Sequence, residues 1–85
     1  MTDPEPGTSG PDVGPLGQTF SREVRRLREL RGLSQTDLAL QLREQYGLKL
    51  HQATIDRVEK AQRPCRLDEV YALADILGST LDDML

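Results

Sequence analysis

The chain has 85 residues, room for one domain, and its 11 Lys and Arg against 14 Asp and Glu give a net charge of −3. With two Tyr, one Phe and no Trp, the core must be built from aliphatic side chains, which suits packed helices. The single Cys65 excludes an internal disulfide, and no apolar run approaches the ~20 residues of a membrane span, so we expect a cytoplasmic protein with no membrane partner.

Residues 1–19 are predicted to be a disordered tail. They contain four Pro and four Gly, with only Val13 and Leu16 as sizeable apolar side chains. Such a segment cannot bury enough apolar surface to offset the conformational entropy that ordering would cost. The folded domain is therefore expected to span residues 20–85.

The first helix is predicted to run from Phe20 or Ser21 to Arg31, with Ser21 as its N-cap. Gly32 follows it as a glycine that ends a helix in the left-handed conformation. The helix is amphipathic, because one stripe at spacings of three and four residues carries Phe20, Val24, Leu27 and Arg31.

Two further helices are expected between residues 34 and 60. Ser34 is the expected N-cap of the first, with Asp37 completing a capping box, and this helix runs to about Tyr46 before Gly47 stops it. The next helix covers roughly Gln52 to Lys60. Their expected core residues are Leu38, Ala39, Leu42, Ile55 and Val58, with Tyr46 as a further candidate.

After a loop at 61–66 that contains Pro64, a fourth helix is expected to begin near Leu67 with acidic residues in its first turn. Its expected stripe is Leu67, Val70, Leu73, Ala74 and Leu77. Gly78 ends it, and a short fifth helix follows Ser79 and Thr80. No strand pattern appears, so the predicted class is all-α.

Charge is distributed unevenly along the chain. All eleven Lys and Arg lie in residues 20–66 together with six Asp and Glu, whereas residues 1–19 and 67–85 carry only acidic charges. This arrangement leaves an electropositive surface on the middle helices, as expected for a protein that binds nucleic acid. A basic helix face that is merely solvated would give the same count.

Over about residues 22–85 the chain resembles the phage-repressor-like (Xre-type) helix-turn-helix DNA-binding family. The resemblance implies a compact five-helix bundle of the lambda-repressor-like type that binds operator DNA, commonly as a two-fold dimer. It rests on several linked segments in the right order, namely Leu27-Arg28, Arg31-Gly32-Leu33-Ser34-Gln35, Leu38-Ala39, 52–59, Leu67-Asp68-Glu69, Leu73-Ala74, Leu77-Gly78 and Leu81-Asp82-Asp83.

The resemblance implies a role for each matching residue. Gln35 matches a glutamine that contacts a phosphate and braces the recognition helix, although it could instead serve only as a cap; Thr36 could add a second phosphate contact. The residues implied to face the major groove are Gln52, Ala53, Asp56 and Arg57. Lys60 and Arg63 are implied to follow the DNA backbone.

Asp56 is unusual among these residues, because phosphates repel a carboxylate. It either accepts a hydrogen bond from cytosine, orients Arg57, or lies off the groove. Arg28 and Glu59 match a structural ion pair that joins the first helix to the third, where loss of one partner leaves an uncompensated charge. The competing interpretation is two independent surface charges.

The chain departs from the family pattern in two places. The interval from Leu38 to Ile55 is about six residues longer than is usual where a short turn joins the two helices, so we expect an extended connection. The family pattern therefore does not predict the angle between these two helices. Ala61 stands where a glycine is frequent, so we expect a less sharply turned exit from the third helix.

The leading functional hypothesis is a sequence-specific transcriptional regulator, a repressor that inserts residues 52–60 into the major groove of an operator. Two copies, joined as a homodimer or only on DNA, would occupy half-sites ~34 Å apart. The alternative is an antitoxin or another protein-interaction module that uses the same bundle. We expect no enzyme, cofactor or metal site, because one His, one Cys and scattered carboxylates form no catalytic or ligand set.

Overall fold

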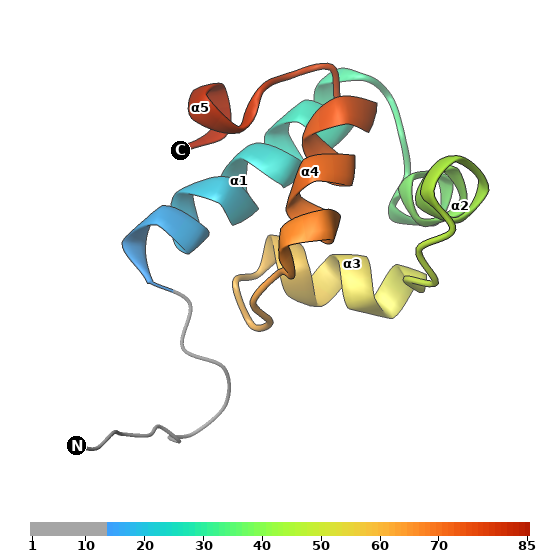
Figure 1. The fold of residues 1–85 in the computed structure, drawn as a ribbon, viewed down its shortest axis with the longest axis horizontal. Helices are drawn as coiled ribbons and strands as arrows, with labels where there is room; N and C mark the ends of the chain where they lie inside the picture. Colours follow the sequence, from blue (N-terminus) through green and yellow to red (C-terminus); the bar gives the residue numbers. More distant parts are fainter. Residues whose placement is uncertain (1–13) are drawn as a thin grey trace.

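The computed structural model describes residues 14–85, which form five helices and no strand. The helices are α1 (Pro15–Leu30), α2 (Gln35–Tyr46), α3 (Gln52–Glu59), α4 (Leu67–Ile76) and α5 (Leu81–Met84). Figure 1 shows α3 along one edge of the bundle, with α1 and α4 on its inner side and α2 next to its first residues. The prediction of an all-α five-helix bundle is confirmed.

The core draws on every helix. Its largest fully buried side chains are Val24 of α1, Leu38 and Leu42 of α2, Ile55 and Val58 of α3, Leu73 and Leu77 at α4, and Met84 of α5. Met84 therefore closes the core of the single chain, even though α5 has only four residues. Burial of these apolar side chains is the main favourable contribution to folding.

Two side chains predicted for the core lie at the surface instead. Leu67 is 81% exposed, because it occupies the first position of α4, before that helix meets its neighbours. Tyr46 is exposed at the end of α2, and its hydroxyl donates to the Asp75 carboxylate of α4 rather than entering the core.

The prediction that residues 1–19 form a disordered tail is wrong for residues 15–19. The helix α1 begins at Pro15, five residues before the expected start, with Gly14 as its N-cap. Proline suits the first position of a helix, because its φ is already helical and its missing N–H would have had no partner. Ser21 is consequently a buried mid-helix residue and not a cap. Residues 1–13 lie outside the described residues.

The helix ends are set by local signals. The capping box of Ser34 and Asp37 is present at the start of α2, as predicted. Gly32 and Gly47 adopt φ values of +71° and +67° after α1 and α2. After Gly32, the N–H of Leu33 bonds to the Arg28 carbonyl at 3.0 Å, which satisfies an orphan carbonyl of α1.

The exit of α3 corrects a second expectation. Ala61 adopts a φ of 56°, the left-handed conformation that glycine adopts at the other helix ends. The N–H of Gln62 then reaches the Arg57 carbonyl at 2.9 Å, closing α3 as sharply as a glycine would. The alanine therefore carries backbone strain at the end of the exposed helix. Within residues 14–85, no helix is both long and apolar enough to cross a membrane.

Candidate DNA interface

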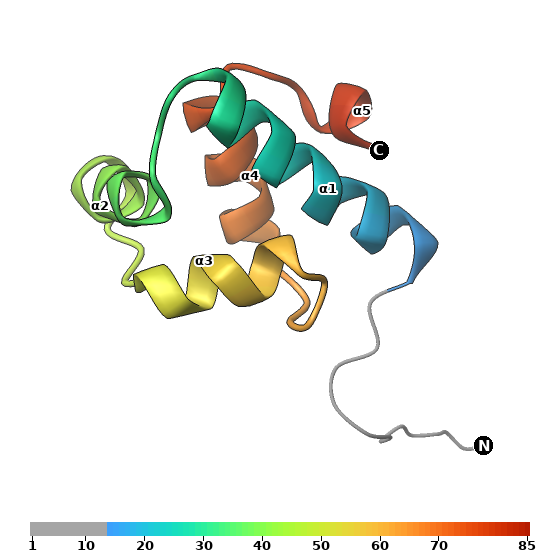
Figure 2. The ribbon, with the colours of Figure 1, turned by 180° about the vertical axis from the view of Figure 1, so that it is seen from behind.

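The outer face of α3 is open to solvent. Ile55 and Val58 anchor the helix in the core, while Gln52, Ala53 and Arg57 are exposed. Figure 2 shows that α3 forms the edge of the bundle from the opposite side as well. All four residues expected to face the major groove therefore lie on this helix of eight residues, and three of them are exposed while Asp56 is half-buried.

Gln35 connects α2 to this helix through its side-chain amide. Its Nε2 donates to Oδ1 of Asp56 at 3.1 Å and to Oε1 of Glu59 at 3.0 Å, and its Oε1 accepts from Nε2 of Gln52. Both amide hydrogens of Gln35 are therefore used within the protein. The bracing role is present in the structure, whereas a phosphate contact by this side chain would require a bond to break. Its backbone N–H remains at the start of α2.

Arg28 and Glu59 form the ion pair that the resemblance implies. The Arg28 Nε and Nη2 atoms donate to the two Glu59 carboxylate oxygens at 2.6 and 3.1 Å, and Nη1 donates to the Leu33 carbonyl at 2.8 Å. The side chains are only 11% and 3% exposed. Together with Gln35, this pair fixes the end of α3 against α1 and α2.

The Asp56 carboxylate is paired with side chains of the same chain. Its Oδ2 lies 3.0 Å from the Lys60 Nζ one turn later on α3, and its Oδ1 accepts from Gln35. These two partners, Lys60 first, hold the pKa of Asp56 below its ordinary value of 3.8. The suggestion that Asp56 orients Arg57 is not supported, because its contacts run to Lys60 and Gln35.

Arg63 is also occupied. Its Nη1 and Nη2 atoms donate to the two oxygens of Glu69 at 2.9 and 3.0 Å, and the Glu69 side chain is 5% exposed. The Arg63 guanidinium makes the largest contribution to lowering the pKa of Glu69. Burial acts in the opposite direction, and the hydrogen bond from the Arg66 N–H lowers the pKa further. This bridge ties the 61–66 loop to α4, and the expected backbone contact by Arg63, which stays a prediction, would require the bridge to break.

The basic residues before α3 behave differently. Arg43 near the end of α2 and Lys49 in the connection are exposed, and within the described part of the chain neither has a side-chain hydrogen bond or an ion pair. Arg57 on α3 is likewise unpaired there. Sequence reasoning singled out Arg57 and missed Arg43 and Lys49, because ion pairs formed by the fold cannot be seen in a count of charges.

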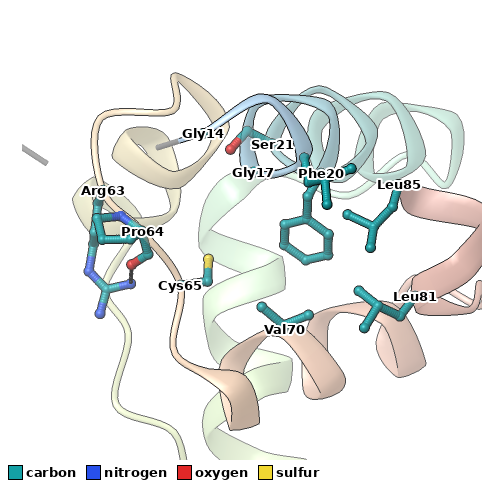
Figure 3. A pocket seen from close by; sticks show the side chains of 11 residues that line it. Gly14, Gly17, Phe20, Ser21, Arg63, Pro64, Cys65, Val70, Leu81 and Leu85 are labelled. Atoms are coloured by element: carbon teal, nitrogen blue, oxygen red, sulfur yellow. Dashed lines mark hydrogen bonds between the residues drawn. The ribbon is translucent and has the colours of Figure 1, made fainter. Parts of the chain in front are cut away.

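A separate apolar hollow lies at the other end of the bundle. Figure 3 shows Phe20 of α1 and Val70 of α4 facing Leu81 and Leu85 across a cavity of about 310 Å³, with Cys65 at its side. Burial raises the pKa of the Cys65 thiol to about 11. The thiol therefore stays protonated at neutral pH.

Comparison with known proteins identifies one family. A family model for a helix-turn-helix domain matches residues 19–85, which extends from the second turn of α1 to the last residue of the chain. No curated protein and no solved structure is similar enough to match the chain.

Proposed function

The chain belongs to the helix-turn-helix domain family, and starting from this membership we propose that it is a sequence-specific transcriptional regulator. The exposed face of α3 would enter the major groove of an operator. The observation that carries the proposal is the presentation of Gln52 and Arg57 on an exposed helix whose inner side is fixed by Ile55, Val58 and Glu59.

The hydrogen bond between Gln52 and Gln35 leaves Gln52 suited to reading a base. It occupies one hydrogen of the Gln52 amide and leaves the second hydrogen and the carbonyl oxygen unused. An adenine edge offers the complementary pair, because N7 accepts a hydrogen bond and N6 donates one. Since Gln35 already holds the amide, less side-chain freedom is lost when DNA binds.

Arg57 and Ala53 complete the base-reading set. An unpaired guanidinium can donate to O6 and N7 of guanine, and a small methyl group fits against the methyl of thymine. Asp56 and Lys60 neutralise one another beside them and are proposed to shape the face without selecting a base. The proposed activity is binding alone, with no catalytic step and no cofactor.

We assign the protein a repressor role by occlusion, in which α3 on a promoter excludes polymerase. One short helix per chain gives weak affinity, so two copies would occupy half-sites ~34 Å apart. The apolar hollow that includes Leu81 and Leu85 offers each copy a surface for pairing, before or only upon DNA binding. The stoichiometry of the complex, measured by sedimentation with one and two half-sites, tests this arrangement.

The same hollow favours a second candidate function. An antitoxin or another protein-interaction module would use the apolar surface around Phe20 and Val70 to hold a protein, and α3 would then bind DNA without sequence preference. Unlabelled duplexes of unrelated sequence distinguish the two functions. They compete equally if protein binding is the role, and poorly if the protein reads a specific operator.

Selection of bound sequences from a random duplex pool tests the proposed function directly. We expect the wild type to enrich one site, and Gln52→Ala and Arg57→Ala each to relax one position of it at a cost of about 1–3 kcal/mol. Gln45→Ala is the control, because Gln45 is exposed on α2 and its side chain has no hydrogen bond to α3 among the described residues. Absence of enrichment with the wild type would remove the proposal.

A further inference from the structure

A second hollow lies between α2 and the beginning of α3. It has a volume of about 180 Å³, and Leu50 and Ala39 contribute apolar side chains to it. Its polar lining comes from Thr36 and Arg43 on one face of α2 and from His51 and Gln52 at the start of α3. Gln52 is shared between this hollow and the exposed face of α3, so the hollow continues the candidate interface.

The polar groups of the hollow are available to a ligand. Thr36, Arg43 and His51 are exposed, and among residues 14–85 none of their side chains makes a hydrogen bond or an ion pair. Lys49, two residues before His51, adds a further exposed cation without a partner in that range. Neither Asp37 nor Glu44, the acidic residues of α2, lines the hollow. The available charge is therefore positive.

The basic side chains after α3 differ from those before it, because each already lies near a carboxylate. Lys60, Arg63 and Arg66 all lie within 4 Å of a carboxylate of the same chain, at 3.0, 2.9 and 3.9 Å respectively. A phosphate that approached them would compete with Asp56, Glu69 and Asp68. A phosphate that approached Arg43 or Lys49 would displace only water.

We propose that the hollow between α2 and α3 binds the phosphodiester backbone of DNA. Arg43 of its lining and Lys49, which precedes the lining residue Leu50, supply the charges, and the Thr36 hydroxyl is the hydrogen-bond donor. This assignment rests on the proposed function, since it places the backbone beside the groove that Gln52 enters. Thr36 and Arg43 are seven positions apart, roughly 10 Å along α2, so they would contact different points of the strand. Guanidinium and ammonium groups are the usual phosphate ligands of proteins.

The connection between α2 and α3, residues 47–51, gives this assignment a structural reason. The final turn of α2 and the connection after Gly47 supply Arg43 and Lys49, and they precede α3 immediately. The phosphate contacts are thereby placed before the base-reading helix, while the basic residues after it already lie next to carboxylates of the same chain.

The salt dependence of DNA binding tests the inference. Fluorescence anisotropy with one labelled duplex, between about 50 and 200 mM salt, gives the slope of log K against log salt, which reports the number of phosphates neutralised. We expect Arg43→Gln/Lys49→Gln to reduce this slope by about two and to weaken binding to all duplexes alike. Arg26→Gln/Arg66→Gln removes two cations that are paired with Glu23 and Asp68 and should leave the slope nearly unchanged.

A third variant separates direct contact from the general field of the protein. Thr36→Val keeps every charge and nearly the same shape, so it should leave the slope unchanged and weaken binding about fivefold through the lost hydrogen bond. Far-UV circular dichroism and a thermal melt establish that each variant is folded.

The outcomes are distinguishable from those of the base-reading proposal. A slope unaffected by Arg43→Gln/Lys49→Gln, or affected equally by Arg26→Gln/Arg66→Gln, overturns the backbone site while sequence selection by Gln52 and Arg57 stands. Conversely, a wild type that selects no sequence yet shows the expected slopes retains the backbone site and loses the regulator. A wild type with no affinity for any duplex overturns both.

Discussion

The two ends of α3 carry similar basic residues and offer them differently. Before the helix, Arg43 and Lys49 are exposed and, in the described chain, unpaired; after it, Lys60, Arg63 and Arg66 each have a carboxylate within 4 Å. Removal of a cation before α3 should therefore change binding, whereas removal of Arg63 should change stability. The charge available to a ligand is the charge that the fold leaves uncompensated, and this differs from the charge in the sequence.

The largest loss of stability is expected at Glu59, whose ion pair with Arg28 holds the end of α3. Glu59→Gln leaves the nearly buried Arg28 guanidinium with only the exposed Glu29 carboxylate, 3.9 Å from its Nη2, as a counter-charge. We expect it to lower the free energy of unfolding by about 3 kcal/mol. Glu29→Gln is the matched control, because Glu29 is exposed, pairs with Arg25 at the surface and reaches Arg28 only at 3.9 Å, so it should contribute at most about 0.5 kcal/mol. Urea unfolding at fixed ionic strength measures both, and equal losses would contradict a structural role for the α3 end.

The bridge between Arg63 and Glu69 should give the next largest effect, of about 2 kcal/mol for Arg63→Gln at neutral pH. Because Arg63 lowers the pKa of Glu69 in the folded state, the bridge stabilises the fold above the ordinary pKa of 4.5 and is lost as the pH falls through the folded-state pKa. The difference in unfolding free energy between wild type and Arg63→Gln should therefore shrink below about pH 4.5.

Arg66→Gln serves as its control. Arg66 lies 3.9 Å from Asp68 and both side chains are well exposed, so the difference from wild type should be small at every pH. A loss for Arg63→Gln that is independent of pH would show that the side chain acts through packing and not through the bridge.

Gln35 tests both ends of α3 at once, because this first residue of α2 is hydrogen-bonded to Gln52 at the start of α3 and to Glu59 at its end. Gln35→Ala removes two hydrogen bonds to carboxylates, and we expect a loss of about 1–2 kcal/mol in unfolding free energy. It also releases Gln52, so the base preference assigned to Gln52 should weaken in the selected site. Gln45→Ala, at an exposed position of the same helix, should do neither, and equal effects from both would remove the brace.

The features that could be predicted from the sequence are those with local causes. The capping box of Ser34 and Asp37 and the left-handed Gly47 fixed both ends of α2 correctly, because each signal lies within a few residues of the helix end it determines. The start of α1 was missed for a related reason. Proline and glycine together indicated disorder, whereas Pro15 alone is a favourable first residue of a helix.

The candidate site was less predictable, because its hydrogen bonds join residues far apart in the chain. The partners of Gln35 lie 17 to 24 residues further along, and their contacts require the packed angle between α2 and α3. Arg63 lies only six residues from Glu69, yet the loop that brings them together depends on Ala61 adopting a positive φ. No composition or spacing rule indicates that an alanine will do so.

The same alanine gives the smallest expected effect and the cleanest test of how α3 ends. Ala61→Gly should raise the free energy of unfolding by up to about 1 kcal/mol, because glycine adopts a φ near 56° without steric strain. Gly32→Ala is the reverse substitution at another helix end. Gly32 has a φ of +71°, and an added Cβ would meet nothing within 4 Å, so the substitution introduces backbone strain alone. We expect a loss of similar size, measured by thermal unfolding of the pair. If Ala61→Gly instead destabilises the protein, the turn after α3 is held by contacts of the Ala61 methyl group, and the strain assigned to this exit is wrong.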